Sequence, residues 1–184
     1  MVKSKVDVCN LLTSEDVKAV QGEAYKDAQR SDRLDNEFIV AQCYYALPTT
    51  TNSVVVNVTT AKDETGAPSP KGFWEKTFGG DEEKEREGKA ERGREGEKRE
   101  REREKEKAQQ PREREEEGDA KEASPPVRVK DLGDEAFWVG SPVGGALYVL
   151  KNDLYCRISI GGAGDQKAKL NKSKMLAQKI LNKI

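Results

Sequence analysis

The chain has 184 residues, a formal net charge of −1 and no histidine. Its length fits a single domain, and the lack of histidine excludes Ser-His and Cys-His nucleophile pairs as well as the commonest metal ligand. No run of about 18 apolar residues is present, so the sequence predicts no transmembrane segment. Charged residues make up 36% of the chain, more than the roughly 25% of an average globular protein, and the excess lies between residues 62 and 126.

A short helix is the first element that the sequence predicts. Thr13 suits the N-cap position, and Asp16 stands at N3, near the positive end of the helix dipole. Gly22 is expected to end this helix after about Gln21. Residues 24–37 are polar, and we expect them to form a loop.

Two strands and a second helix are expected next. Residues 38–47 are apolar on both faces of a strand, whereas residues 53–60 place valines at every second position of one face. The turn between these two segments predicts a hairpin. Residues 72–78 indicate a short helix in which Trp74 and Phe78 stand four residues apart, so their rings can dock together on the sheet.

A charged low-complexity segment, residues 81–123, is expected to interrupt the single domain formed by residues 1–184. Between Glu100 and Lys107 the charges alternate in sign, which puts like charges four residues apart and offsets the favourable pairs at three residues. Glycines and a proline also disfavour a long helix here. The segment therefore predicts a disordered insert, either a solvated loop or an interaction arm.

The strongest pattern in the chain is a hairpin centred on a two-residue turn, Asn152-Asp153, between two apolar runs. This turn places Leu147 opposite Ile158 on an apolar face, which is expected to lie on the core. On the other face Tyr148 stands opposite Arg157, and the guanidinium group can lie over the tyrosine ring.

Residues 135–139 predict a further strand before this hairpin. After it, the glycine-rich segment 161–164 lacks the spacing of a phosphate-binding loop, so it indicates a strand-to-helix turn capped by Asp165. The C-terminal helix has an apolar stripe of Leu176, Ala177, Ile180, Leu181 and Ile184. Together these elements predict an α+β fold, an antiparallel sheet of about five strands with the N- and C-terminal helices packed on one face.

An acidic cluster, Asp131, Asp134 and Glu135, lies where the third predicted strand begins. Paired carboxylates can perform acid–base chemistry or hold Ca²⁺, but acids beside a glycine more often form a solvated turn. These three residues, together with Tyr148 and Arg157, are weak candidates for a surface site. The sequence shows no catalytic constellation, metal site or cofactor motif, so we expect no cofactor and no enzymatic activity.

The three cysteines are too far apart in sequence for a zinc site of the CxxC type. Cys43 and Cys156 lie on predicted strands, and Cys9 precedes the first helix. All three can be small core residues, two of them can form a disulfide, for which Cys9 and Cys43 are the first candidates, or one can be a reactive thiol.

Several segments of the chain resemble a known kind of domain. They are CNLLTSEDVKAVQGE near the start, Cys43-Tyr-Tyr in the first strand, LGDEAFW, ALYVLKNDLYCRISIGG and a helix containing MLAQKIL. The pattern is similar to small secreted or lipid-anchored bacterial domains of unknown function, of the type found in envelope lipoproteins, and covers most of the chain outside residues 62–126. The resemblance implies an antiparallel α+β domain with helices packed on its sheet and a cysteine pair, Cys9 and Cys43.

The first hypothesis for the function is a non-catalytic binding or interaction domain of the bacterial cell envelope, suggested by the resemblance and by the lack of histidine. Such a domain would be periplasmic or otherwise extracytoplasmic, as a mature fragment, with an unknown protein or small ligand as its partner. Membrane anchoring would need an N-terminal part that is absent from this chain.

Two alternatives stay open. A cytoplasmic scaffold could act through the Arg/Glu-rich segment, although its mixed sign argues against nucleic-acid binding, which needs net positive charge. A hydrolase could use Asp131, Asp134 and Glu135, and a large pocket beside these acids would favour it.

Overall fold

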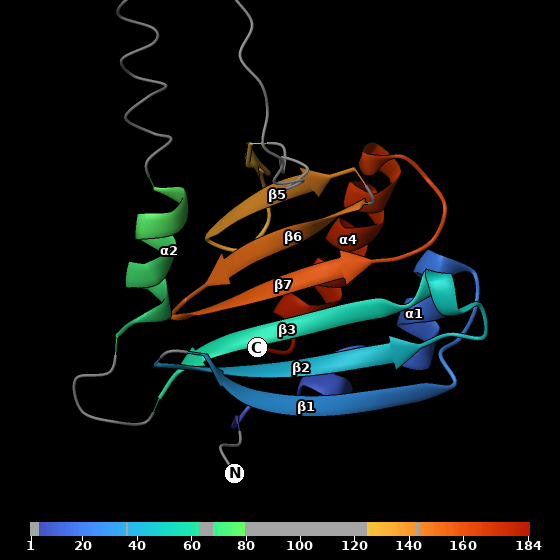
Figure 1. Cartoon of the computed structure of the whole chain (residues 1–184), viewed down its shortest axis with the longest axis horizontal. Helices are drawn as coiled ribbons and strands as arrows, with labels where there is room; N and C mark the ends of the chain where they lie inside the picture. The colour runs from blue at the N-terminus through green and yellow to red at the C-terminus, as the bar shows by residue number, and fades with distance from the viewer. Residues whose placement is uncertain (1–3, 36, 63–67, 80–124, 143) are drawn as a thin grey trace, which may run out of the picture.

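The computed structural model describes residues 4–35, 37–62, 68–79, 125–142 and 144–184. The elements run in chain order (Figure 1) as η1 (Val8–Asn10), α1 (Ser14–Gln21), β1 (Asp27–Asp35), β2 (Phe38–Ala46), η2 (Thr50–Asn52), β3 (Val54–Ala61), α2 (Pro70–Phe78), β4 (Val127–Arg128), β5 (Glu135–Ser141), β6 (Gly144–Lys151), β7 (Leu154–Ile160) and α4 (Gln166–Leu181). The insert expected at residues 81–123 lies outside the described residues.

All strands of the described residues belong to one antiparallel sheet. Their spatial order is β1-β2-β3-β7-β6-β5-β4, and every neighbouring pair runs antiparallel. Strands β1 to β3 and strands β4 to β7 thus form two sets that join at the centre of the sheet, where β3 pairs with β7. The structure confirms an α+β fold with an antiparallel sheet, but this sheet has seven strands rather than about five.

The prediction of a loop over residues 24–37 is wrong, because β1 occupies most of this segment and pairs with β2 along its whole length. β1 lies at the edge of the sheet and leaves its side chains exposed or half-buried, so it needs no apolar alternation. Charged residues on an edge strand also discourage pairing with other chains. The second unexpected strand, β4, is short and follows Pro125 and Pro126, which lack the N–H group needed for strand pairing.

The predicted register of the β6–β7 hairpin is confirmed. Leu147 pairs with Ile158, and Tyr148 pairs with Arg157. Leu147 and Ile158 are fully buried in the core on the face that α1 and α4 cover, which we call the inner face. Because side chains alternate along a strand, Tyr148 and Arg157 belong to the opposite, outer face. The expected β2–β3 hairpin is also present.

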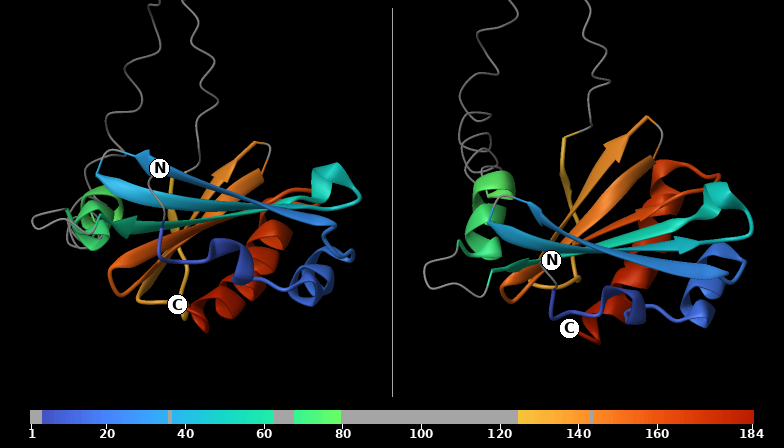
Figure 2. Two further views of the ribbon diagram at one scale, coloured as in Figure 1. Left: turned by 90° about the horizontal axis from the view of Figure 1, so that it is seen from below. Right: turned by 60° about the horizontal axis from the view of Figure 1, so that its bottom comes forward.

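Helices α1 and α4, together with η1, pack on the inner face of the sheet (Figure 2). α4 lies against β6 and β7, and its residues Leu176, Ala177 and Ile180 are buried as predicted. Asp165 caps α4, as expected, by accepting a hydrogen bond from the backbone N–H of Ala168 (2.7 Å). Among the helices of the described residues, none is long and apolar enough to cross a membrane.

α2 packs on the outer face, at the end of the sheet that lies away from α1 (Figure 1). As predicted, Trp74 and Phe78 dock together on the sheet, with ring centroids 4.6 Å apart. Both rings pack in a cluster with Phe137 and Leu150 of the sheet. The cluster explains why Leu150 is buried although it belongs to the outer face.

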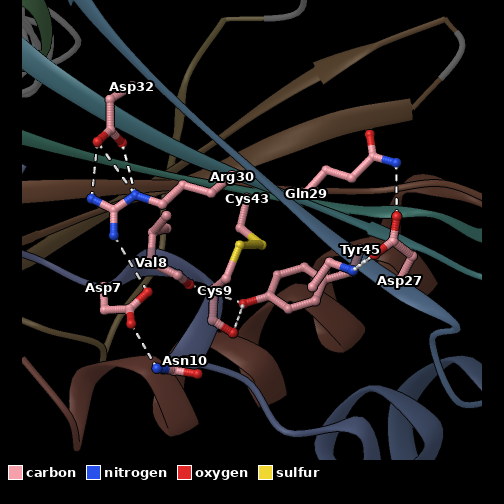
Figure 3. Close-up of a disulfide and its surroundings, with 11 residues drawn as sticks. Asp7, Val8, Cys9, Asn10, Asp27, Gln29, Arg30, Asp32, Cys43 and Tyr45 are labelled. Carbon is pink, nitrogen blue, oxygen red and sulfur yellow. Dashed lines mark hydrogen bonds and ion pairs between the residues drawn. A yellow bond between two sulfur atoms is a disulfide. The ribbon is translucent and has the colours of Figure 1, made fainter. Parts of the chain in front are cut away.

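Cys9 of η1 and Cys43 of β2 form a disulfide (Figure 3), which confirms the expected pair. Tyr45, two residues further along β2, donates a hydrogen bond from its hydroxyl to the carbonyl of Val8 (3.0 Å). Burial raises the pKa of this hydroxyl, so it stays protonated and remains a donor. The disulfide and the hydrogen bond together hold η1 against the inner face. Cys156 is a free, buried thiol.

The N-terminus of α1 makes a contribution to stability that depends on pH. The Thr13 hydroxyl accepts a hydrogen bond from the Asp16 backbone N–H, and the Asp16 carboxylate accepts one from the Thr13 backbone N–H (3.0 Å). Burial opposes ionisation of Asp16, but the hydrogen bonds from Thr13 and the charge of Lys179 outweigh burial and lower its pKa. A lowered folded-state pKa stabilises the fold above the unfolded-state value of about 4, and this stabilisation is lost as the pH falls below it.

Asp16→Asn is therefore expected to lower the free energy of unfolding by about 0.3–1 kcal/mol at pH 7 and by clearly less at pH 3. Urea titrations followed by circular dichroism at both pH values measure this difference. Glu15→Gln removes another acid of the same helical turn, one that is not part of the capping box, and serves as the control. A loss of the same size at both pH values would contradict a role for the ionised carboxylate.

Candidate functional site

A row of polar side chains crosses the outer face of the sheet. The register aligns Gln42 of β2 with Asn57 of β3. On the other side of Asn57 stand Arg157 of β7 and then Tyr148 of β6. This row separates the apolar part of the outer face under α2 from a hollowed part at the other end of the strands.

Arg157 is the cation of this row. As predicted from the register, it lies by Tyr148: its Nε donates a hydrogen bond to the tyrosine hydroxyl (3.1 Å), and its guanidinium carbon lies 5.8 Å from the ring centre. The three other arginines among the described residues, Arg30, Arg33 and Arg128, each lie within 4.0 Å of a carboxylate. In the part of the chain that the structure describes, Arg157 has no such partner. Its terminal nitrogens can therefore donate to an anion from outside the chain.

Next to Arg157 the outer face is hollowed into a cavity of about 480 Å³, which we call the trough. The sheet surface is low here because the outer-face side chains of neighbouring strands are small, and Ala146 of β6 pairs with Ser159 of β7. Larger side chains at these positions would fill the space. Among the described residues, Arg157 is the one charged side chain that lines the trough, so the electrostatic potential of this lining favours an anion.

Helix α2 bounds a second cavity of about 330 Å³ on the same face, which we call the aromatic hollow. Its lining from α2 and the sheet consists of Phe73, Trp74, Thr77, Phe78, Val139, Tyr148 and Tyr155. None of the charged side chains that the structure describes lines it. Val139 and Tyr148 line both the trough and the aromatic hollow, so the two cavities adjoin at these side chains.

Two polar contacts, one at the N-terminus of α2 and one at Trp74, hold this helix against the sheet. Ser69 caps the helix by accepting a hydrogen bond from the Gly72 N–H, and its hydroxyl also donates to Asp153 in the β6–β7 turn. The buried indole of Trp74 donates from Nε1 to the carboxylate of Glu135 (2.7 Å). The hairpin turn predicted from the sequence thus also anchors the helix that bounds the aromatic hollow.

Of the surface residues that the sequence singles out, Tyr148 and Arg157 lie together in the trough. The trough itself was not predicted. A sequence signal for it exists in Ala146 and Ser159, small residues that stand two positions from Tyr148 and Arg157 and therefore lie on the same face of the hairpin. The glycines of β5 and β6 have a different role on the inner face, where a Cβ on Gly145 would collide with the Trp138 ring and one on Gly140 with the Gln166 side chain.

The acidic cluster does not converge on either cavity. Asp131 is exposed in a turn, and Asp134 accepts a hydrogen bond from the backbone N–H of Asn152 (2.6 Å). Glu135 accepts the indole hydrogen bond that fixes α2, as described above. Within the described ranges, no three His, Cys, Asp or Glu side chains are grouped so that they could hold a metal ion. In this structure two of the three acids thus support the hairpin turn and α2.

Comparisons of the chain with known proteins give no match: no protein-family model, no curated protein and no solved structure matches it. We therefore infer the function from the residues of the outer face. The trough with Arg157 adjoins the aromatic hollow, and these two cavities form the candidate site.

Proposed function

We propose that the chain is a non-catalytic binding domain of the bacterial cell envelope, and that it holds its ligand in the trough through one anionic group on Arg157. The observation that carries this proposal is the position of Arg157, which has no carboxylate partner among the described residues and stands at a cavity that none of the described acids lines. A guanidinium group offers paired N–H donors that match a carboxylate or a phosphate.

The contact between Arg157 and Tyr148 supports binding over a merely solvated side chain. The hydrogen bond from Nε to the tyrosine hydroxyl restricts the guanidinium before a ligand arrives, which reduces the conformational entropy lost on binding. The volume of the trough, about 480 Å³, lies in the range of roughly 300–1,000 Å³ that is typical of small-ligand sites. A small ligand with a single negative charge suits this site.

The envelope location is supported by the disulfide between Cys9 and Cys43, because disulfides persist in oxidising compartments and are rare in the cytosol. The resemblance to small secreted or lipid-anchored bacterial domains supports the same location. The alternative of a scaffold depends on residues 81–123, which lie outside the described ranges. The alternative of a hydrolase is weaker, since none of its acids lines the trough or the aromatic hollow.

Sodium benzoate is expected to bind the full chain in the trough, and benzamide, a neutral molecule of the same shape, is expected to bind at least tenfold more weakly. A hydrogen bond to a charged group contributes about 1.5–3 kcal/mol, and about 1.4 kcal/mol corresponds to a tenfold change in affinity. NMR titrations of ¹⁵N-labelled protein measure both affinities from the chemical shifts of amides in β6 and β7.

Arg157→Gln should abolish the preference for benzoate over benzamide. Arg33→Gln is the matched control, because Arg33 is an exposed arginine on the edge strand β1, outside the trough. This control should keep the full preference. Equal binding of benzoate and benzamide to the unchanged chain, or an equal loss of preference in the two variants, would refute the anion site.

A further inference from the structure

We infer that the ligand is a free, single-chain amphipathic carboxylate whose head group binds Arg157 while its apolar tail lies in the aromatic hollow. This inference rests on the proposed function and extends it from a type of charge to a class of molecule. It follows from three features of the outer face, namely the junction of the two cavities, the charges in their linings and the exposure of Phe73.

The first feature is the junction, where Tyr148 belongs to both cavities. Its hydroxyl accepts the hydrogen bond from Arg157 (3.1 Å), and its ring lies 5.5 Å from the ring of Phe78 in α2. One side chain therefore spans the distance between the cation and the apolar wall. A ligand whose anionic end meets Arg157 has an apolar cavity within one side-chain length of that end.

The second feature is the charge of the combined lining, in which Arg157 is the one charged residue that the described part of the chain contributes to the two cavities. One cation compensates one negative charge. A phosphate monoester carries close to two charges at neutral pH, and the second charge would be desolvated without a partner, which is unfavourable. A carboxylate carries a single charge and matches the guanidinium in shape.

The third feature is Phe73, whose side chain lies on the rim of the aromatic hollow and is 43% exposed. Trp74, by contrast, is buried and fixed by its hydrogen bond to Glu135. The hollow thus has a fixed wall and an exposed apolar rim. An alkyl tail entering it would remove the exposed part of Phe73 from water, which is favourable in proportion to the apolar area buried.

The test is a chain-length series on the full protein, using sodium butanoate, hexanoate, octanoate and decanoate below micelle-forming concentrations. Burial of a methylene group raises affinity about two- to fourfold, so octanoate is expected to bind at least tenfold more tightly than butanoate. Octan-1-ol, which has the tail without the charge, is expected to bind at least tenfold more weakly than octanoate. Isothermal titration calorimetry measures each affinity.

Thr77→Trp should fill the aromatic hollow, because Thr77 lines it from an exposed position on α2. This variant is expected to lower the affinity for octanoate at least fivefold and to leave butanoate unchanged. Glu75→Trp makes a comparable change on an exposed residue of the same helix that does not line the hollow, and should leave both affinities unchanged. Phe73→Ala, which removes the exposed rim, is a second variant and should lower octanoate affinity several-fold.

The possible failures of the two proposals can be told apart. If affinity does not rise with chain length while benzoate still binds through Arg157, the tail site is refuted and the anion site stands. If octan-1-ol binds as well as octanoate, or if Arg157→Gln leaves octanoate binding unchanged, the amphipathic carboxylate is refuted; if benzoate also loses its preference over benzamide, the anion site is refuted as well. Binding to phosphatidylglycerol vesicles without binding to free octanoate would overturn the free carboxylate as the occupant.

Discussion

Leu147→Asp is expected to leave the chain unfolded at neutral pH. Leu147 has no exposed surface and lies opposite Ile158 on the inner face, at the centre of the core. A carboxylate at this position would be surrounded by apolar side chains, and a buried charge without a partner costs several kcal/mol. That cost is comparable with the whole stability of a domain, about 5–15 kcal/mol. Far-UV circular dichroism and urea titration measure the loss.

Two variants control for this result. Leu34→Asp makes the same substitution on the edge strand β1, where the leucine is 46% exposed, and should change the free energy of unfolding by no more than about 1 kcal/mol. Tyr148→Asp changes the next residue of β6, which is half-buried on the outer face, and should be milder than Leu147→Asp. Equal destabilisation by Leu147→Asp and Tyr148→Asp would contradict the assignment of the two faces.

The register of the central hairpin could be predicted because a slip by one residue would move Leu147 and Ile158 from the core to solvent. Helix starts at Thr13 and Asp165 could be predicted for a similar reason, since a cap depends on hydrogen bonds between residues close in sequence. β1 could not, because the hydrogen bonds that hold this edge strand to β2 are made by the backbone. Backbone pairing leaves little pattern in the side chains of an exposed strand.

The candidate site was predictable only in part, for the same physical reason. Tyr148 and Arg157 are neighbours across one hairpin, so the local register brings them together. The trough also needs Val55 of β3 beside β7, and Val139 of β5 beside β6. That arrangement depends on the order of the whole sheet, in which the N-terminal strands join the C-terminal ones through β3 and β7. No local pattern specifies this order.

The role of Glu135 could not be predicted either, because its partner is distant in sequence. From the sequence it belongs to an acidic cluster with Asp131 and Asp134, and such a cluster can suggest acid–base chemistry. In the structure its partner is the indole of Trp74, which is 61 positions away in the sequence. A buried indole N–H needs an acceptor, and the Glu135 carboxylate supplies it. From the sequence alone, this structural carboxylate is grouped with neighbouring acids that could be catalytic.

The second large effect is expected from the disulfide. The bond between Cys9 and Cys43 closes a loop with a sequence separation of 34, and on the chain-entropy model a loop of this length stabilises the fold by about 3–4 kcal/mol. The double variant Cys9→Ser, Cys43→Ser should therefore lose about that much free energy of unfolding in urea titrations. Cys156→Ala, which keeps the disulfide, is the control and should lose less.

Thiol counting gives an independent check on the same bond. Cys156 is buried on the inner face opposite Val149, and burial raises the pKa of its thiol to about 12. The thiol is therefore protonated and unreactive in the folded chain. Protein made under oxidising conditions should show no reactive thiol when folded and one in denaturant. Three thiols in denaturant, or a double variant as stable as the parent chain, would contradict the disulfide and remove the main structural support for an envelope location.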